Sequence, residues 1–119
     1  MNVLIVDDNT EAADLLAELL ADDYVVRTTH SGTQALKAVN EERFDVALVD
    51  IMLPDVPGVE LAEELRARSP ALVMIAISGS SLDELRAHQG ARANFSHFLQ
   101  KPIDFEQLAG LLSGLSPND

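Results

Sequence analysis

Five short apolar runs alternate along the chain with segments of helical periodicity, and this alternation limits the possible folds more than any other feature. The runs cover residues 3–6, 24–29, 46–49, 72–77 and 97–100. The first, third and fourth are almost wholly apolar, as expected of parallel strands that are covered on both faces. The second alternates more between apolar and polar residues, which favours an edge strand.

The segments between these runs carry signals for helix starts. Asn9 or Thr10 precedes apolar residues that we expect to share one helical face: Ala12, Leu15, Leu16, Leu19 and Leu20. Capping-box spacing predicts further helix starts at Ser31 and Ser81, each followed three residues later by Gln or Glu. Asp104 precedes a last amphipathic segment in the same way.

A third helix is expected after the turn formed by residues 54–58, with Leu61, Ala62 and Leu65 facing inward. Alternating strands and helices predict an α/β fold, a doubly wound parallel sheet with right-handed crossovers and helices on both faces. For five strands the expected order is the flavodoxin-like 2-1-3-4-5. The length of 119 residues fits one domain, residues 1–119, with a frayed tail from residue 113.

The chain is strongly acidic, with 20 acidic against 8 basic side chains and a formal net charge of -12. Such a charge repels phosphate backbones and anionic lipids, so we expect no direct binding to nucleic acid or membranes. No apolar run reaches membrane-spanning length, and the first residues lack the pattern of a signal peptide. The absence of cysteine excludes thiolate metal sites and thiol redox chemistry. It is also compatible with a reducing compartment, so we expect a cytoplasmic protein.

Acidic residues follow two strands that the predicted order makes neighbours. Asp7 and Asp8 end the first strand, and Asp50 ends the third. In open α/β sheets, ligands bind beyond the carboxyl ends of the strands, where the strand order reverses. Two like charges about 4 Å apart repel by roughly 4 kcal/mol at an effective dielectric of 20, so such a cluster needs a cation or raised pKa values. Carboxylate oxygens suit Mg²⁺, although the Asp pair taken alone fits a helix N-cap better.

The remaining strand ends carry a hydroxyl and an ammonium group. Ser78 and Gly79 end the fourth strand, and Lys101, followed by Pro102, ends the fifth. Gly79 leaves room for a ligand beside the backbone, and an X-Pro bond adopts the cis form in some tight turns. Each residue alone also fits an ordinary role, as a turn serine or a solvated loop lysine. Jointly, a carboxylate nucleophile, a metal, a hydroxyl donor and a cation describe a phosphoryl-transfer site.

These residues form a pattern that resembles the response-regulator receiver family over essentially the full length of the chain. The matching segments are VLIVDD at residues 3–8, DVALVDIMLP at 45–54, Gly58, ISG at 77–79 and FLQKP at 98–102. Each segment is weak evidence by itself, but their order and spacing together are highly specific. The resemblance implies a phosphorylation-dependent signalling switch of a two-component system or phosphorelay, and not an enzyme with an independent substrate.

The resemblance implies a role for each residue of the acidic edge. Asp50 would be the phospho-acceptor, attacking the phosphorus of a phosphohistidine. Asp8, Asp50 and the main-chain carbonyl of Met52 would hold Mg²⁺, with Mn²⁺ as an alternative, and Asp7 would act partly through water. Lys101 would pair with a phosphoryl oxygen.

The resemblance also implies how phosphorylation is read out. Ser78 would hydrogen-bond a phosphoryl oxygen, with Gly79 beside the phosphate, and would draw its loop inward. Phe98 would then turn inward and reshape the face formed by helix four, strand five and helix five. A lone aromatic at strand spacing is usually a core residue, so both roles stay open for Phe98. The implied partners are a histidine kinase or histidine phosphotransfer protein and a downstream protein on that face, with homodimerisation left open.

Three positions depart from the usual family pattern. Ser78 stands where threonine is commoner, which keeps the hydroxyl but loses a methyl group that restricts χ1. Phe98 replaces the frequent tyrosine, so no phenol hydroxyl is available there. Asn94 stands where a glycine generally ends helix four, and asparagine can adopt the left-handed conformation of such a position. Gly90 would weaken that helix from inside.

Three other functions are compatible with parts of the pattern. A phosphatase of the haloacid-dehalogenase type needs a second Asp two residues after its nucleophile, but Asn9 and Met52 stand at that offset from the candidate nucleophiles. A flavin-binding electron carrier needs a phosphate loop after the first strand, where the acidic residues would repel a phosphate. A receiver fold that only docks partners would not need the acceptor-site residues, all of which are present. The sequence leaves open whether the chain acts alone or belongs to a longer regulator or hybrid kinase.

Overall fold

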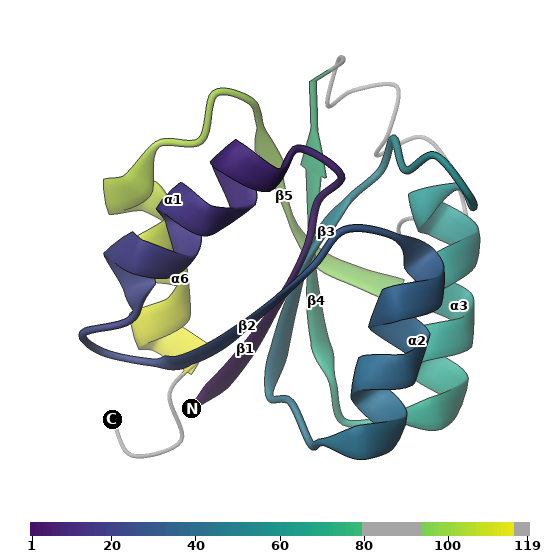
Figure 1. The fold of residues 1–119 in the computed structure, drawn as a ribbon. Coiled ribbons are helices and arrows are strands. Elements are labelled where there is room, and N and C mark those ends of the chain that lie inside the picture. Colours follow the sequence, from purple (N-terminus) through teal and green to yellow (C-terminus); the bar gives the residue numbers. More distant parts are fainter. Residues whose placement is uncertain (80–93, 116–119) are drawn as a thin grey trace.

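The structure, a computed structural model, describes residues 1–79 and 94–115, and its centre is a five-stranded parallel sheet (Figure 1). The strands are β1 (Asn2–Val6), β2 (Val25–Thr29), β3 (Val46–Asp50), β4 (Val73–Ser78) and β5 (Phe95–Gln100). Their order across the sheet is β2-β1-β3-β4-β5, and every neighbouring pair is parallel. The predicted flavodoxin-like order and the edge position of the second strand are therefore confirmed.

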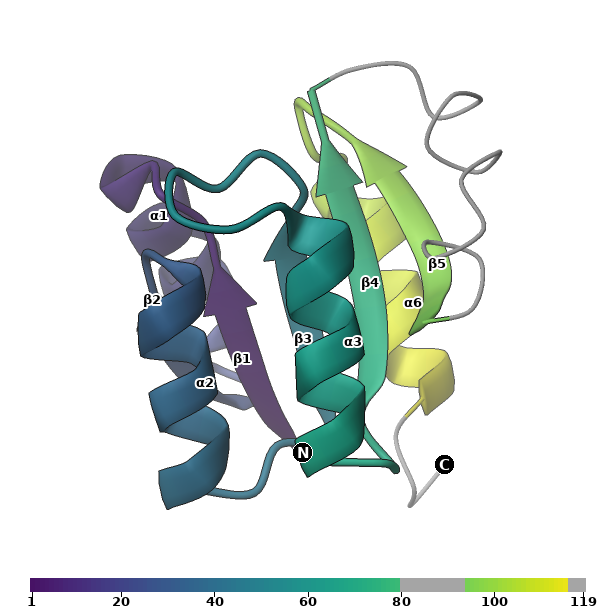
Figure 2. The ribbon, with the colours of Figure 1, turned by 90° about the vertical axis from the view of Figure 1, so that its right-hand side faces the viewer.

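Helices cover both faces of this sheet. The described helices are α1 (Thr10–Leu20), α2 (Gly32–Glu41), α3 (Gly58–Arg68) and α6 (Phe105–Leu115). Helices α1 and α6 lie on one face, and α2 and α3 lie on the other (Figures 1 and 2). Alternate residues of β1 serve the two faces, because Leu4 and Val6 join the core under α2 and α3 whereas Val3 and Ile5 join the core under α1 and α6. Burial on both faces explains the nearly continuous apolar runs.

The fifth strand begins two residues earlier than its apolar run predicted, at Phe95. Its pairing with β4 is irregular at this point, because Met74 pairs with Phe95 and Ile75 pairs with His97. Ser96 is thus an extra residue in the ladder, and it is exposed whereas Phe95 is buried. The bulge interrupts the period of two on which strand prediction depends, and this hid the beginning of β5.

Side-chain caps begin α1, α2 and α6 where the sequence predicted them. Asn9 is the N-cap of α1, and its side chain accepts a hydrogen bond from an N–H of the first turn at 3.1 Å. Ser31 caps α2 through the N–H of Gln34, also at 3.1 Å. The side-chain oxygen of Gln34 accepts a hydrogen bond from the N–H of His30. In a strict capping box it would accept from the N–H of Ser31 instead. Asp104 accepts hydrogen bonds from the first turn of α6.

Only Leu16 and Leu20 are buried among the apolar residues expected to share one face of α1. Leu15 and Leu19 are 58% and 46% exposed, and Ala12 is exposed as well. The buried residues of α1 are Ala13, Leu16 and Leu20. Because a turn has 3.6 residues, positions 13, 16 and 20 face the sheet whereas positions 12, 15 and 19 form a second stripe beside it. The apolar surface of α1 is therefore wider than the sheet covers.

Asn94 does not have the left-handed conformation that asparagine can adopt. Asn94 is among the described residues, and none of those apart from glycine has a positive φ. The carbonyl of Asn94 accepts a hydrogen bond from Arg66 at 2.9 Å. The same guanidinium donates to the carbonyls of Pro70 and Leu72, just before β4. Arg66 thus anchors the chain where it enters β5, and no left-handed residue is needed at Asn94.

Three further predictions concern helix four and the ends of the helices. Helix four, with its expected start at Ser81 and the effect of Gly90, falls outside the described residues. The frayed tail was expected from residue 113, whereas α6 continues to Leu115. Within residues 1–79 and 94–115, none of the helices combines the length and the hydrophobicity that crossing a bilayer requires.

Candidate functional site

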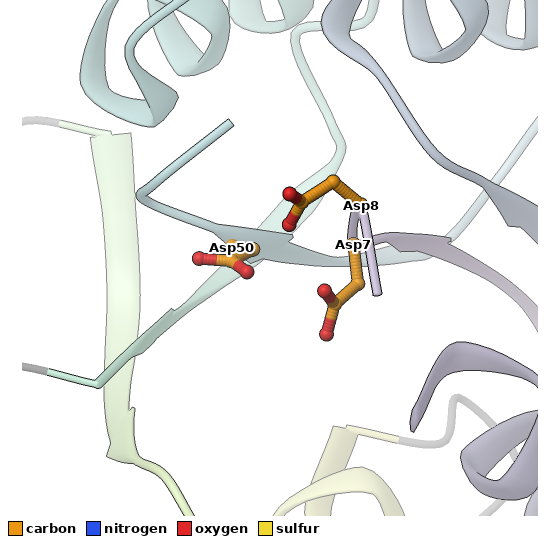
Figure 3. Close-up of side chains that lie close together, drawn as sticks. All are labelled: Asp7, Asp8 and Asp50. Carbon is orange, nitrogen blue, oxygen red and sulfur yellow. The ribbon is translucent and has the colours of Figure 1, made fainter. Parts of the chain in front are cut away.

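The carboxyl ends of β1 and β3 bring three acidic side chains together. The two strands are direct neighbours, with Val6 opposite Val49, so the residues that follow them meet at one edge of the sheet. One carboxylate oxygen from each of Asp7, Asp8 and Asp50 lies within 4.8 Å of the others (Figure 3). Asp7 and Asp50 are only 5% and 3% exposed, whereas Asp8 is exposed. The three carboxylates therefore converge at this edge of the sheet, as predicted.

The carboxylate of Asp50 is held from two sides. Its Oδ1 accepts a hydrogen bond from the N–H of Met52 at 2.9 Å, and its Oδ2 accepts one from Nζ of Lys101 at 2.9 Å. Nζ of Lys101 also lies 3.3 Å from Oδ2 of Asp7. The other oxygen of Asp7 accepts from the N–H of Asn9 at 2.9 Å. One ammonium group therefore bridges the two buried carboxylates.

Lys101 is positioned by the end of β5. Its N–H donates to the carbonyl of Ser78 at 2.8 Å, and its bond to Pro102 is cis. Partial burial disfavours the charged form of Lys101, but the hydrogen bond to Asp50 and the charges of Asp50 and Asp7 outweigh it. The pKa of Lys101 is therefore raised above its ordinary value of 10.5. The side chain is fully charged at neutral pH.

Negative charge exceeds positive charge in this cluster. Among the described residues, three carboxylates cluster here, and the ammonium group of Lys101 pairs with two of them, Asp7 and Asp50. The ordinary explanation for an Asp pair after a strand, a helix N-cap, does not apply here because Asn9 caps α1. Carboxylate oxygens with an excess of negative charge are the donor set that a hard divalent cation such as Mg²⁺ prefers. The residues present therefore fit a magnesium site.

Ser78 and Gly79 lie at the same edge of the sheet. Asp50 pairs with Ile77, so Ser78 is one position further along β4, and it is 3% exposed. A Cβ added to Gly79 would meet no atom of the described residues within 4 Å. The side chain of Met52 is 70% exposed, and its main chain contacts Asp50. The roles of Ser78 and Gly79 toward phosphate, and of the Met52 carbonyl toward a metal, stay predictions.

Phe98 lies on β5, three residues before Lys101. Its side chain is partly buried against the core under α2 and α3. Its ring also meets that of Phe95 edge to face, with 6.2 Å between the ring centroids. A packing role is thus present in this conformation, and the role of Phe98 as an aromatic switch stays a prediction.

An apolar cavity beside the site was not predicted from the sequence. It has a volume of about 560 Å³ and is lined by Asp7, Gly79 and Lys101 together with apolar residues of α1, of the segment after β5 and of the start of α6. The exposed Leu15 and Leu19 are among them. The available signal is the second apolar stripe of α1, which helical periodicity alone does not separate from the buried face.

A contact between the segment joining β3 to α3 and the start of α2 was also not predicted. Asp55 accepts hydrogen bonds from the main-chain N–H groups of Gly32 and Thr33. The only signal in the sequence is an acidic residue in the turn at residues 54–58. Acidic residues are common in turns, so this signal does not say which distant groups the carboxylate binds.

The chain is similar to known proteins in sequence and in fold. Residues 3–113 match the family model described as "Response regulator receiver domain". A curated relative, the transcriptional regulatory protein ZraR of Klebsiella oxytoca, is 33% identical over 115 residues. The aligned region is 95% of this chain but 26% of that regulator, so the chain spans about a quarter of its relative's length.

Two solved structures are similar over nearly the whole chain. A response regulator receiver domain (CheY-like) from Methylobacillus flagellatus has a TM-score of 0.87 and 32% sequence identity, and the match covers 98% of both chains. The response regulator TrrA of Thermotoga maritima, in complex with Mg²⁺-BeF, has a TM-score of 0.86 and 27% identity, with coverage of 97% of this chain and 98% of TrrA. The chain therefore belongs to the response regulator receiver domain family of two-component signalling, and as a receiver domain it is a signalling protein rather than a catalytic enzyme.

Proposed function

We propose that this chain is a phosphorylation-dependent signalling switch in which Asp50 accepts the phosphoryl group. The observation that carries the proposal is the setting of Asp50, a nearly buried carboxylate beside two other carboxylates and the ammonium group of Lys101. An oxygen of Asp50 attacks the phosphorus of a phosphohistidine. The P–N bond breaks, and the imidazole keeps the electron pair and takes up a proton. The donor is a histidine kinase or a histidine phosphotransfer protein.

The proposal includes a Mg²⁺ ion, with Mn²⁺ as the alternative. Asp8, Asp50 and the main-chain carbonyl of Met52 would hold it, and Asp7 would act partly through water. When bound, the ion neutralises charge on the carboxylates and on the oxygens of the transferring group. Support comes from the clustered carboxylate oxygens of this chain and from the related TrrA, whose structure contains Mg²⁺-BeF.

Side chains at the ends of β4 and β5 would receive the phosphoryl oxygens. Lys101 keeps its charge beside Asp50 and pairs with one of them. The hydroxyl of Ser78 donates to another, and Gly79 leaves room for the phosphate beside the backbone. The movement of Ser78 that follows draws Phe98 inward and changes the face formed by helix four, β5 and α6. A downstream protein binds there, or a second copy of the chain does.

The donor is proposed to dock over the apolar stripe of α1. Leu15 and Leu19 are exposed, and the cavity that they line is also bordered by Asp7 and Lys101. A helix of the donor that covers this stripe would bring its phosphohistidine to Asp50. The match over residues 3–113 supports one receiver domain spanning residues 1–119. Its proposed location is the cytoplasm, where ATP supplies histidine kinases with phosphoryl groups.

Incubation with acetyl phosphate and Mg²⁺, followed by measurement of the intact mass, tests this function. The wild type should gain one phosphoryl group and Asp50→Asn should gain none, because the nucleophilic carboxylate is gone. EDTA should abolish the gain in the wild type.

Asp45→Asn is the matched control for this experiment. Asp45 stands at the opposite end of β3 and accepts a hydrogen bond from the N–H of Asn2 at 2.8 Å, which an amide oxygen can still accept. This variant should be modified like the wild type. An equal mass gain in the wild type and in Asp50→Asn would overturn the assignment of Asp50.

A further inference from the structure

The main chain directly after Asp50 forms an arc, residues 51–57, that leads into α3. The base of the arc is closed by hydrogen bonds of Ile51, whose N–H donates to the carbonyl of Ile77 at 3.0 Å and whose carbonyl accepts from the N–H of Gly58 at 2.9 Å. Next in the arc is Met52, whose N–H donates to Asp50. The side chain of Met52 is 70% exposed, so packing of that side chain does not hold this part of the arc.

The far part of the arc is tied to α2 through Asp55. Oδ1 of Asp55 accepts a hydrogen bond from the N–H of Gly32 at 2.9 Å. Its Oδ2 accepts from the N–H of Thr33 at 3.0 Å and from the Thr33 hydroxyl at 2.9 Å. Beside this contact, a Cβ on Gly32 would overlap the side chain of Val56, so the close approach of the arc requires glycine there. Both oxygens of one carboxylate thus bind an element 22 and 23 residues away in the sequence.

Helix capping alone does not account for this contact. The helix already has an N-cap, because the side chain of Ser31 accepts a hydrogen bond from the N–H of Gln34. The hydrogen bonds from Gly32 and Thr33 stabilise the ionised form of Asp55 and lower the pKa of its carboxyl below the ordinary value of 3.8. The contact is therefore fully formed at neutral pH, where phosphorylation would take place.

We propose that Asp55 is a positioning residue for the metal site, which it serves by clamping the arc of residues 51–57 onto the start of α2. The clamp holds the main chain of Met52, which binds Asp50 through its N–H and whose carbonyl is the proposed metal ligand. This inference rests on the function proposed above. It assigns to Asp55 an effect on metal affinity, although Asp55 itself contacts neither the metal nor the phosphoryl group.

The test compares Mg²⁺ affinity with thermal stability in the full chain. Mg²⁺ is titrated by calorimetry into the wild type, Asp55→Ala, Asp55→Asn and Ser31→Ala, and the thermal unfolding of each is measured. Ser31→Ala is the matched control, because it removes a hydrogen bond from the same helix start and leaves the arc untouched. Asp55→Asn keeps one acceptor oxygen and is the conservative variant.

Asp55→Ala should weaken Mg²⁺ binding by about 10-fold, as the loss of groups that orient metal ligands commonly does. Ser31→Ala should lower the unfolding temperature but leave the dissociation constant within about twofold, and Asp55→Asn should recover part of the affinity. Equal dissociation constants in Asp55→Ala, Asp55→Asn and wild type would overturn the positioning role and leave the proposed function standing. A wild type without any Mg²⁺ binding would instead overturn the proposed metal site, and the role of Asp55 with it.

Discussion

The two faces of the sheet differ in how they border the acidic cluster. On the face of α2 and α3, the segment after Asp50 is pressed onto Gly32 and fastened by Asp55. On the face of α1 and α6, Leu15 and Leu19 are left exposed and line a cavity that reaches the cluster. One face fastens the main chain that follows Asp50, and the other leaves apolar side chains exposed beside the cluster.

The largest contrast between the faces should come from shortening one leucine on each. Leu65 of α3 is fully buried, so Leu65→Ala should lower the free energy of unfolding by about 2–5 kcal/mol. Leu15→Ala on α1 should change it by no more than about 0.5 kcal/mol, because the side chain is already in contact with solvent. Urea unfolding followed by circular dichroism measures both, since the chain has no tryptophan. Similar losses in the two variants would show that α1 is as closely packed as α3.

A smaller contrast is expected when one helical glycine on each face is replaced by alanine. The two replacements should change the free energy of unfolding in opposite directions. A Cβ on Gly58 would lie 2.6 Å from Cα of Ile51 and 2.8 Å from the carbonyl oxygen of Asp50. These are main-chain atoms, so Gly58→Ala should destabilise by roughly 1–3 kcal/mol. A Cβ on Gly110 of α6 meets no atom within 4 Å, and Gly110→Ala should stabilise by about 0.5–1 kcal/mol through helix propensity. Urea unfolding measures both variants. A Gly58→Ala protein as stable as the wild type would contradict the close packing beside Asp50.

The smallest effect concerns the pH dependence of the Asp55 clamp. The pKa of Asp55 is lower in the folded protein than its ordinary value of 3.8. The ionised carboxylate therefore stabilises the fold at pH values above 3.8. This stabilisation is lost as the pH falls through the lowered pKa of the folded state. The wild type should therefore be more stable than Asp55→Asn at neutral pH, and the difference should shrink in acid. Unfolding in urea from about pH 7 to about pH 3 measures this difference. A difference that stays constant or grows in acid would contradict an ionised clamp.

The sheet order and the acidic cluster could be predicted because both follow from local pattern plus one topological rule. Apolar runs of strand length mark the strands, and parallel strands place their carboxyl ends at one edge. Asp7, Asp8 and Asp50 each come directly after such a run, so their convergence needs no further information. Ser78 and Lys101 also come directly after apolar runs, and in the structure they lie at the same edge of the sheet.

The features that could not be predicted depend on contacts between segments far apart in the chain. The start of β5 was hidden by a bulge at Ser96, and bulges arise from pairing with a neighbour rather than from the pattern of one strand. The buried face of α1 depends on how the helix is rotated against the sheet, which left Leu15 and Leu19 outside. The hydrogen bond from Arg66 of α3 to the carbonyl of Asn94 joins residues 28 positions apart, and no local pattern marks it.

The sequence by itself determined the kind of fold, the residues at each strand end and the charge of the site, because strand periodicity and strand-end chemistry are encoded locally. Only the tertiary structure decided which partners those residues have. It joined Lys101 to both Asp7 and Asp50, and it set Asp55 on the start of α2. The reason is that a carboxylate binds whichever N–H groups the packed elements bring within about 3 Å, and packing depends on all the elements together.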